Sequence, residues 1–172
     1  MPILPKVRDP RLITVRRGGS LTDVDHRLLA EWAATCAEHV LHLLERDSGD
    51  DPRPRQAISA GRAWIRGEVH MEDSRRAAFA ANAAARGLDG PAKFAALSAG
   101  QAAAVAHVAA HDLGAAAYAI RAAQSASASD RAELARLGER DWQREQLPGE
   151  VRLLVLEDQR QRSSICWYVF DD

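Results

Sequence analysis

The stretch from Ala77 to Ala126 constrains the fold of this chain more than any other feature, because alanine dominates it. Alanine has the highest helix propensity of the amino acids, and its methyl group lets helix backbones approach closely. It carries no group that can take part in a reaction. The stretch therefore predicts tightly packed helices, and only His107, His111 and Asp112 interrupt it with titratable side chains between residues 105 and 115.

The composition and charge of the chain limit the kinds of protein that it can be. It has 172 residues, of which 47% are hydrophobic and 27% charged, enough to build the core of one folded domain. The net charge of −1 gives no overall field that would favour nucleic acid or an anionic membrane, so we predict neither partner. Cys36 and Cys166 stand too far apart for a zinc or redox motif. With no apolar leader or membrane-spanning run, we expect a cytoplasmic protein.

Residues 1–10 are richer in proline than the rest of the chain. Pro2, Pro5 and Pro10 predict an irregular arm over residues 1–10, followed by a single α-helical domain over 11–172.

The clearest helix is predicted after this arm and a short strand-like segment. Leu12 to Val15 are typical of a short strand that ends at Gly18-Gly19, and Ser20 or Thr22 is placed to cap a helix over about 23–46. Apolar residues recur at helical spacing along it. They are Val24, Leu28, Trp32, Cys36, Val40 and Leu44, widened by Leu29, Ala33 and Leu43.

Capping residues and prolines divide the remainder into further helices. These are expected over about 54–68, over 73–86 with Asp73 or Ser74 as the cap, over 91–125, from a cap at Ser129 or Asp130 to about 146, and over 149–161.

The chain ends in an apolar segment, 165–170, which is typical of a strand or of a docked tail. Six such residues exposed to water would promote aggregation, so we expect them to be buried, with the segment 12–15 as a candidate neighbour. The predicted fold is an all-α bundle of about six helices, and these two segments are the candidates for a minor two-stranded element.

His107 and His111 are the first candidates for chemistry. Four residues apart on a helix, they share one face and could offer two nitrogen ligands to a transition metal. Asp112 would lie about 100° around the helix from His111, a poor angle for a third ligand. Structural histidines are the favoured interpretation, and a helical metal-dependent enzyme is the alternative. Its further ligands would come from His26, His39, His42 or His70.

Cys36 and His39 are three residues apart on the helix predicted over 23–46. Because Cys36 falls in the apolar stripe, a buried small side chain is favoured over a nucleophile.

Charged clusters give further candidates. Glu68, Glu72 and Asp73 straddle a helix end and a helix start, where acids complement the helix dipole, so a structural role is favoured. Arg152, Arg160 and Arg162 are balanced by nearby acids and predict a salt-bridged surface.

Several catalytic signatures are missing from the sequence. It contains no G-x-x-x-x-G-K-[ST], G-x-G-x-x-G, G-x-S-x-G or H-E-x-x-H motif. A P-loop ATPase and a Rossmann dehydrogenase are therefore excluded, and so is the large subunit of an ATP-dependent exonuclease of the SbcC type.

Several separated segments, spread over about Asp9 to Asp172, resemble one known family. They are Ile13–Asp23, Asp25–Ala30, Trp32–Ala34, Arg62–Trp64, Ala106–His111 with Gly114–Ala119, and Ile165–Phe170. In this order they resemble the Imm-5-like immunity proteins of bacterial polymorphic-toxin systems. The resemblance implies an α-helical, non-enzymatic protein without a cofactor, which binds a cognate toxin in the producing cell.

The resemblance does not identify the face that would bind a toxin. If the toxin is a nuclease, an acidic patch that mimics phosphate is expected, and the candidates lie in 47–51 and 68–73. The individual residues are Asp50, Asp51, Glu68, Glu72 and Asp73. A structural or oligomerising helical protein remains a third hypothesis, and the oligomeric state is open.

Overall fold

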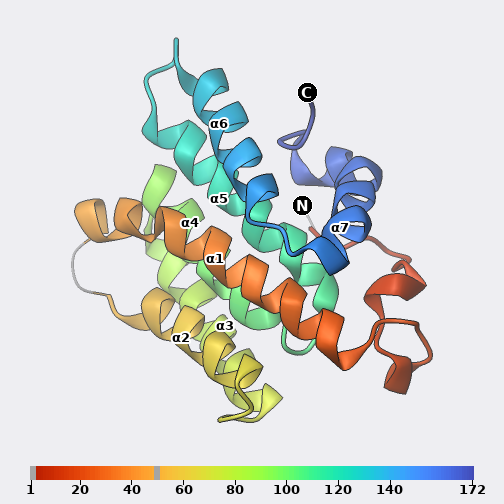
Figure 1. Cartoon of the computed structure of the whole chain (residues 1–172). Helices are drawn as coiled ribbons and strands as arrows, with labels where there is room; N and C mark the ends of the chain where they lie inside the picture. The colour runs from red at the N-terminus through yellow and green to blue at the C-terminus, as the bar shows by residue number, and fades with distance from the viewer. Residues whose placement is uncertain (1–2, 49–50) are drawn as a thin grey trace.

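The computed structural model of the chain describes residues 3–48 and 51–172, and these residues form an all-α bundle, as predicted (Figure 1). The described residues contain seven α-helices, one more than the predicted number. They are α1 (Asp23–Ser48), α2 (Arg53–Ile65), α3 (Met71–Ala84), α4 (Gly90–Ala104), α5 (Asp112–Ala126), α6 (Ala132–Glu145) and α7 (Gly149–Arg162). Short 3-10 helices occupy Pro10–Leu12, Val15–Arg17, Ala85–Gly87, Ala109–His111 and Ser163–Cys166.

Helix α1 crosses the front of the bundle in Figure 1 and packs against α2, α4 and α5. Its start confirms the predicted cap, because the hydroxyl oxygen of Thr22 accepts a hydrogen bond from the backbone N–H of Asp25 at 3.0 Å. Trp32 and Cys36 are buried as their spacing predicts. The predicted stripe is wrong at Val24, whose side chain is exposed.

The predicted helix over 91–125 is wrong as a single element, because the chain turns between α4 and α5 and the two helices pack against each other. A continuous helix of that length would extend about 50 Å and leave most of its alanines without a packing partner. In the hairpin, the hydroxyl of Ser98 donates to the carbonyl oxygen of Ala115 at 2.8 Å. The buried alanines of the two helices include Ala95, Ala96, Ala99, Ala102, Ala103, Ala115, Ala116, Ala117, Ala119 and Ala122.

Helices α2 and α3 pack closely on α4. A β-carbon at Gly61 would lie 3.6 Å from the α-carbon of Ala103, so the two backbones approach with little between them. The predicted caps of the third helix are wrong. It begins at Met71 with His70 as the N-cap, and Asp73 lies in the first turn, where its carboxylate accepts from the backbone N–H of His70 at 3.1 Å.

Helix α6 packs on α5 and is hydrogen-bonded to α1. Its predicted caps are also wrong, because α6 begins at Ala132 with Arg131 at the N-cap. The buried side-chain amide of Gln143 donates to the carbonyl oxygen of Ala116 at 3.2 Å. The indole N–H of Trp32 donates to the carbonyl oxygen of Gln143 at 2.8 Å.

The predicted two-stranded element does not form among the described residues. The segment from Leu12 to Val15 is part of the two 3-10 turns that precede α1, and its one bridge joins Thr14 to Leu21. The C-terminal segment is a docked tail in which Val169 and Phe170 are buried.

Arginine side chains explain why the tail needs no strand partner. Arg136 donates to the carbonyl oxygen of Val169 at 2.9 Å, and Arg144 donates to that of Phe170 at 2.8 Å. These bonds satisfy backbone oxygens that a neighbouring strand would otherwise bond.

The prediction of a salt-bridged surface is wrong for Arg162, which is buried at the end of α7. Its guanidinium donates to the Asp158 carboxylate at 2.9 Å and to the carbonyl oxygen of Ala110 at 2.9 Å. Asp112 is fully buried beside it, with its carboxylate 3.4 Å from the guanidinium. Charge pattern alone does not reveal this burial, because only Asp158 is a neighbour on the same helix, whereas Asp112 lies on α5 and Ala110 lies in the turn before it. In Figure 1 the N-terminal segment lies beside α7.

Within residues 3–48 and 51–172, no helix combines the length and the apolar character that crossing a bilayer would require.

Candidate functional site

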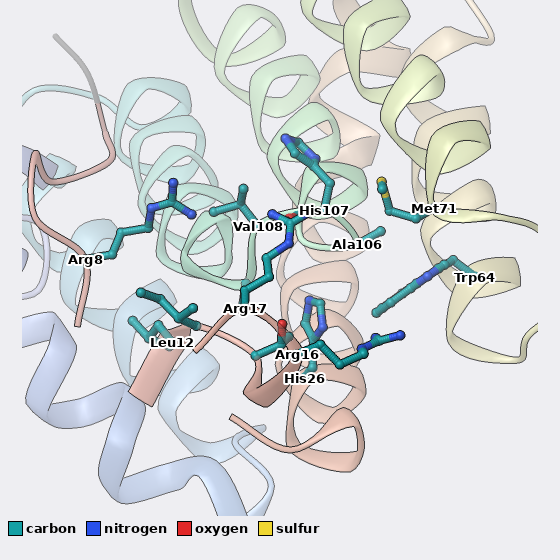
Figure 2. A pocket seen from close by; sticks show the side chains of 13 residues that line it. Arg8, Leu12, Arg16, Arg17, His26, Trp64, Met71, Ala106, His107 and Val108 are labelled. Atoms are coloured by element: carbon teal, nitrogen blue, oxygen red, sulfur yellow. The ribbon is translucent and has the colours of Figure 1, made fainter. Parts of the chain in front are cut away.

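A cleft of about 470 Å³ opens where the N-terminal segment meets the end of α2 and the connection between α4 and α5 (Figure 2). Figure 2 shows Arg8 and Arg17 reaching it from the N-terminal segment, and Trp64 reaching it from α2. The residues that line it are Arg8, Leu12, Ile13, Thr14, Arg16, Arg17, His26, Trp64, Met71, Ala106, His107, Val108 and Ala109.

A tight turn holds the arginines at this cleft. Gly18 has a φ of 87°, in the left-handed region that favours glycine, and it ends the 3-10 helix Val15–Arg17. A β-carbon at Gly19 would lie 2.0 Å from the carbonyl oxygen of Ile13, so only glycine fits there. The turn brings the chain back to pair at Leu21, and Arg16 and Arg17 lie along the cleft.

The cleft is positively charged. None of the 13 residues that line it is acidic, and Arg8, Arg16 and Arg17 are all exposed. Arg16 forms an ion pair with Asp23 at 3.0 Å. Arg17 donates to the carbonyl oxygen of His107 over a long 3.4 Å. Arg8 has no hydrogen-bond or ion-pair partner among the described residues, so a substantial part of the positive charge is uncompensated.

Two aromatic side chains form one wall of the cleft. His26 is buried, and its Nε2–H donates to the carbonyl oxygen of Val105 at 2.7 Å, which satisfies an oxygen left free where α4 ends. Its ring centroid lies 4.9 Å from that of Trp64. Burial lowers the pKa of His26, so the ring is neutral at neutral pH. The charge of the cleft therefore comes from its arginines.

The structure brings His107 and His111 close together, but not as one helical face. His107 lies in the turn after α4 and His111 ends the 3-10 helix Ala109–His111, because the backbone becomes extended at Val108, where φ is −143°. The two ring centroids are 5.3 Å apart. Nδ1 of His111 is bonded to the side-chain oxygen of Gln101 at 2.7 Å. Nδ1 of His107 is buried and has no described partner.

Burial also keeps both of these rings neutral. It lowers the pKa of His111 to about 4, with a smaller contribution from His107. Burial likewise lowers the pKa of His107, assisted by the positive charges of Arg75 and Arg17. Neutral imidazoles are able to bind a metal, so the decisive question is whether further ligands are present.

Nothing in the described part of the chain completes a metal site, because no three His, Cys, Asp or Glu side chains are grouped to hold an ion. Asp112 is bonded within the buried network around Arg162. On α1, Nδ1 of His39 is bonded to the Glu139 carboxylate at 2.8 Å, and its ring stacks on Trp142 at 3.5 Å. His42 bonds the carbonyl oxygen of His39 at 3.0 Å.

The remaining nucleophile candidate is Cys36, on the buried face of α1. Burial raises the pKa of its thiol well above the ordinary value, so the thiolate needed for reaction is disfavoured. This agrees with the sequence-based interpretation of a buried small side chain.

The structure separates the acidic candidates into two groups and pairs each described member with an arginine. Asp51 pairs with Arg53 at 2.6 Å at the start of α2, and Glu68 pairs with Arg66 at 2.7 Å just after its end. The length of α2 separates the two pairs by about 20 Å. Asp50 lies outside the described residues. Of the others, Glu72 pairs with Arg75 at 3.2 Å, and Asp73 lies 3.5 Å from Arg76.

Sequence reasoning missed the arginines of the N-terminal segment. The signal that could have found them is Arg16-Arg17 placed directly before Gly18-Gly19, an arrangement that presents two guanidinium groups next to a tight turn. Trp64 appeared only within the segment Arg62–Trp64 of the family resemblance, and nothing local indicates that Arg8, Trp64 and His107 would share one cleft.

Together these features define an all-α protein with a cationic, aromatic-walled cleft. Residues 19–150 match the family model described as Imm-5 like putative immunity protein, and the chain belongs to this family. The match includes Trp64, Met71 and His107, and it begins after the three cleft arginines. No curated protein and no solved structure gives a significant match to the chain.

Proposed function

We propose that this chain is a bacterial immunity protein that binds a toxin protein in the cytoplasm of the producing cell and blocks it without catalysis. The observation that carries the proposal is the family match over residues 19–150. The charge and chemistry of the cleft support it and suggest where the toxin binds.

The residue types at the cleft are those that dominate protein interfaces. Arginine, tryptophan and methionine are enriched at such surfaces, and arginine and tryptophan are the most frequent energetic anchors. The cleft offers Arg8, Arg17, Trp64 and Met71 together. Apolar groups beside unpaired arginines favour this face as the toxin-binding surface.

The acidic residues are an alternative contact with the toxin, suited to a basic nuclease. They are Asp50, Asp51, Glu68, Glu72 and Asp73. The arginine pairs of Asp51, Glu68 and Glu72 offset much of the negative field that a phosphate mimic requires. For this reason the cleft is the preferred face.

The test is affinity capture of the tagged chain from a lysate of its native cells, followed by co-expression with the captured toxin and a growth assay. We expect a stoichiometric complex and protection of the cells. A variant with Arg8→Glu and Arg17→Glu should lose both. The matched control is Arg86→Glu with Arg131→Glu, which makes the same charge change at two exposed arginines outside the cleft.

The outcome also separates the alternatives. Failure of the unmodified chain to capture or protect contradicts the proposed function. Loss of protection only in variants of Asp51, Glu68 or Glu72 assigns the toxin to the acidic residues. A higher mass in light scattering without any toxin favours an oligomerising protein, and a stoichiometric metal lost in His107→Ala favours the helical metal-dependent enzyme.

A further inference from the structure

The cleft has a chemical preference that the family assignment does not state. We propose that it binds a side-chain carboxylate of the partner protein, seated between Arg8 and Arg17, with an adjacent apolar or aromatic side chain of the same segment against Trp64 and Met71. This inference rests on the proposed function for the identity of the partner, but not for the chemistry of the site.

The first argument is the supply of unused donors. A guanidinium has five N–H groups in a planar fork that matches a carboxylate. Arg8 uses none of them on a described residue, and Arg17 uses one over a long 3.4 Å contact with the carbonyl oxygen of His107. Two exposed guanidinium groups at one cleft without an acid in its lining are complementary to an anion.

The second argument is the comparison with the other ion pairs of this chain. Arg11, Arg53, Arg66 and Arg136 each reach a carboxylate within 2.7 Å. The sequence holds nearly equal numbers of basic and acidic side chains, 23 and 24, so acids are available for pairing. Arg8 and Arg17 have no carboxylate partner among the described residues, and unlike Arg86 and Arg131, which also lack one, they line the same cleft.

The third argument distinguishes a carboxylate on a protein from a free anion. A free phosphate needs only donors, whereas this cleft is also lined by the apolar side chains of Leu12, Trp64 and Met71. Its volume of about 470 Å³ accommodates several side chains. The combined surface fits a segment that carries acidic and apolar side chains together.

The fourth argument disfavours a nucleic acid. Non-specific binding to a phosphate backbone requires a track of basic groups and is helped by a net positive charge. Here the net charge is −1, and three arginines at one cleft form a compact site and not a track.

The test uses the isolated protein and two capped tetrapeptides, Phe-Glu-Glu-Phe and Phe-Gln-Gln-Phe, which differ only in charge. Binding is followed by nuclear magnetic resonance at the indole N–H of Trp64 and the Nε–H of Arg17. We expect saturable shifts of both signals with the acidic peptide and an affinity at least ~10-fold higher than that of the amide peptide. Added salt should weaken the binding of the acidic peptide only.

Variants and competing probes complete the test. The variant with Arg8→Ala and Arg17→Ala should lose the preference for the acidic peptide, and the variant with Arg86→Ala and Arg131→Ala should keep it. Equal binding of the two peptides overturns the inference. Inorganic phosphate or a short DNA duplex that shifts both signals more strongly than the acidic peptide overturns it as well.

The failures of the two proposals are distinguishable. If the acidic peptide binds as expected but no toxin is captured, the carboxylate site stands and the proposed function fails. If a toxin is captured equally well by the variant with Arg8→Ala and Arg17→Ala, the proposed function stands and the carboxylate site fails.

Discussion

Two groups of arginines in this protein have opposite surroundings. At the C-terminal end, Arg136, Arg144 and Arg162 bond backbone oxygens of the tail and of the turn before α5. At the cleft, Arg8 and Arg17 are exposed and reach no carboxylate among the described residues. The comparison teaches that the presence of an arginine does not reveal its role. An arginine that is bonded within the protein is structural, whereas one without such partners is available to another molecule.

Burial accounts for the difference in partners. A guanidinium removed from water must have its donors satisfied, or the fold loses several kcal/mol, whereas an exposed one is solvated by water. The C-terminal arginines are therefore fixed by hydrogen bonds, and the cleft arginines are free to exchange water for a ligand. Each prediction below tests one side of this comparison.

The largest effect is expected for Arg162→Leu. This change leaves Asp112 and Asp158 buried without their cation, and breaking a buried ion pair costs about 3–5 kcal/mol. Urea unfolding measures the loss. The control is Arg160→Leu, two residues away and exposed, which should change stability by less than about 0.5 kcal/mol. Equal stability of the two variants would contradict a structural role for Arg162.

The second prediction concerns pH. Burial raises the pKa of Asp112 from 3.8 to about 7 although Arg162 opposes the shift, and the facing Asp158 carboxyl is raised in the same direction. The folded protein therefore keeps a proton that the unfolded chain has released. The stability that Asp112 contributes is fully present below pH 3.8 and is lost as the pH rises toward about 7.

The variant Asp112→Asn isolates this contribution, because an amide does not titrate. We expect the stability of the unmodified protein relative to the variant to fall by about 3 kcal/mol between about pH 4 and about pH 7. Urea unfolding at several pH values measures it. A constant difference across this range would show that Asp112 is ionised in the folded protein throughout.

A smaller effect is expected for Arg136→Ala. This change removes the donor to the carbonyl oxygen of Val169 at 2.9 Å and one of the two donors to that of Asp171, at 2.7 Å, and should cost about 1.5 kcal/mol. It should also loosen the tail, so that limited proteolysis cuts after residue 163 sooner than in the unmodified protein. Arg131→Ala, at the N-cap of the same helix, serves as the control. An unchanged cleavage rate would show that the tail is held by its apolar contacts alone.

The smallest change in stability is expected at the cleft. Arg8→Ala with Arg17→Ala should alter the free energy of unfolding by less than about 0.5 kcal/mol, because neither side chain holds a buried group. The same variant should lose capture of the toxin. A large loss of stability would remove the contrast between the two arginine groups.

Local features of the sequence predicted much of the fold. Thr22 caps α1, Trp32 and Cys36 are buried, and the alanine-rich stretch forms closely packed helices. These properties depend on helix propensity, capping and periodicity, which short segments contain.

Properties that depend on distant partners were not predicted. The turn after Ala104 occurs where α4 must reverse to pack on α5, and alanine propensity is equally high on both sides of it. Arg162 is buried because Asp112 and Asp158 lie beside it, and the cleft forms from segments separated by up to about 100 residues. A single sequence contains no local signal for contacts between segments that lie far apart along the chain.

The alanine packing of α4 and α5 also affects how stability responds to temperature. An alanine side chain exposes little apolar surface when the protein unfolds, while its peptide group exposes as much polar surface as any other. Apolar exposure raises the heat capacity of unfolding and polar exposure lowers it. A core rich in Ala96, Ala99, Ala116 and Ala119 therefore gives a small heat-capacity change per residue and a stability curve that is broad and flat around its maximum.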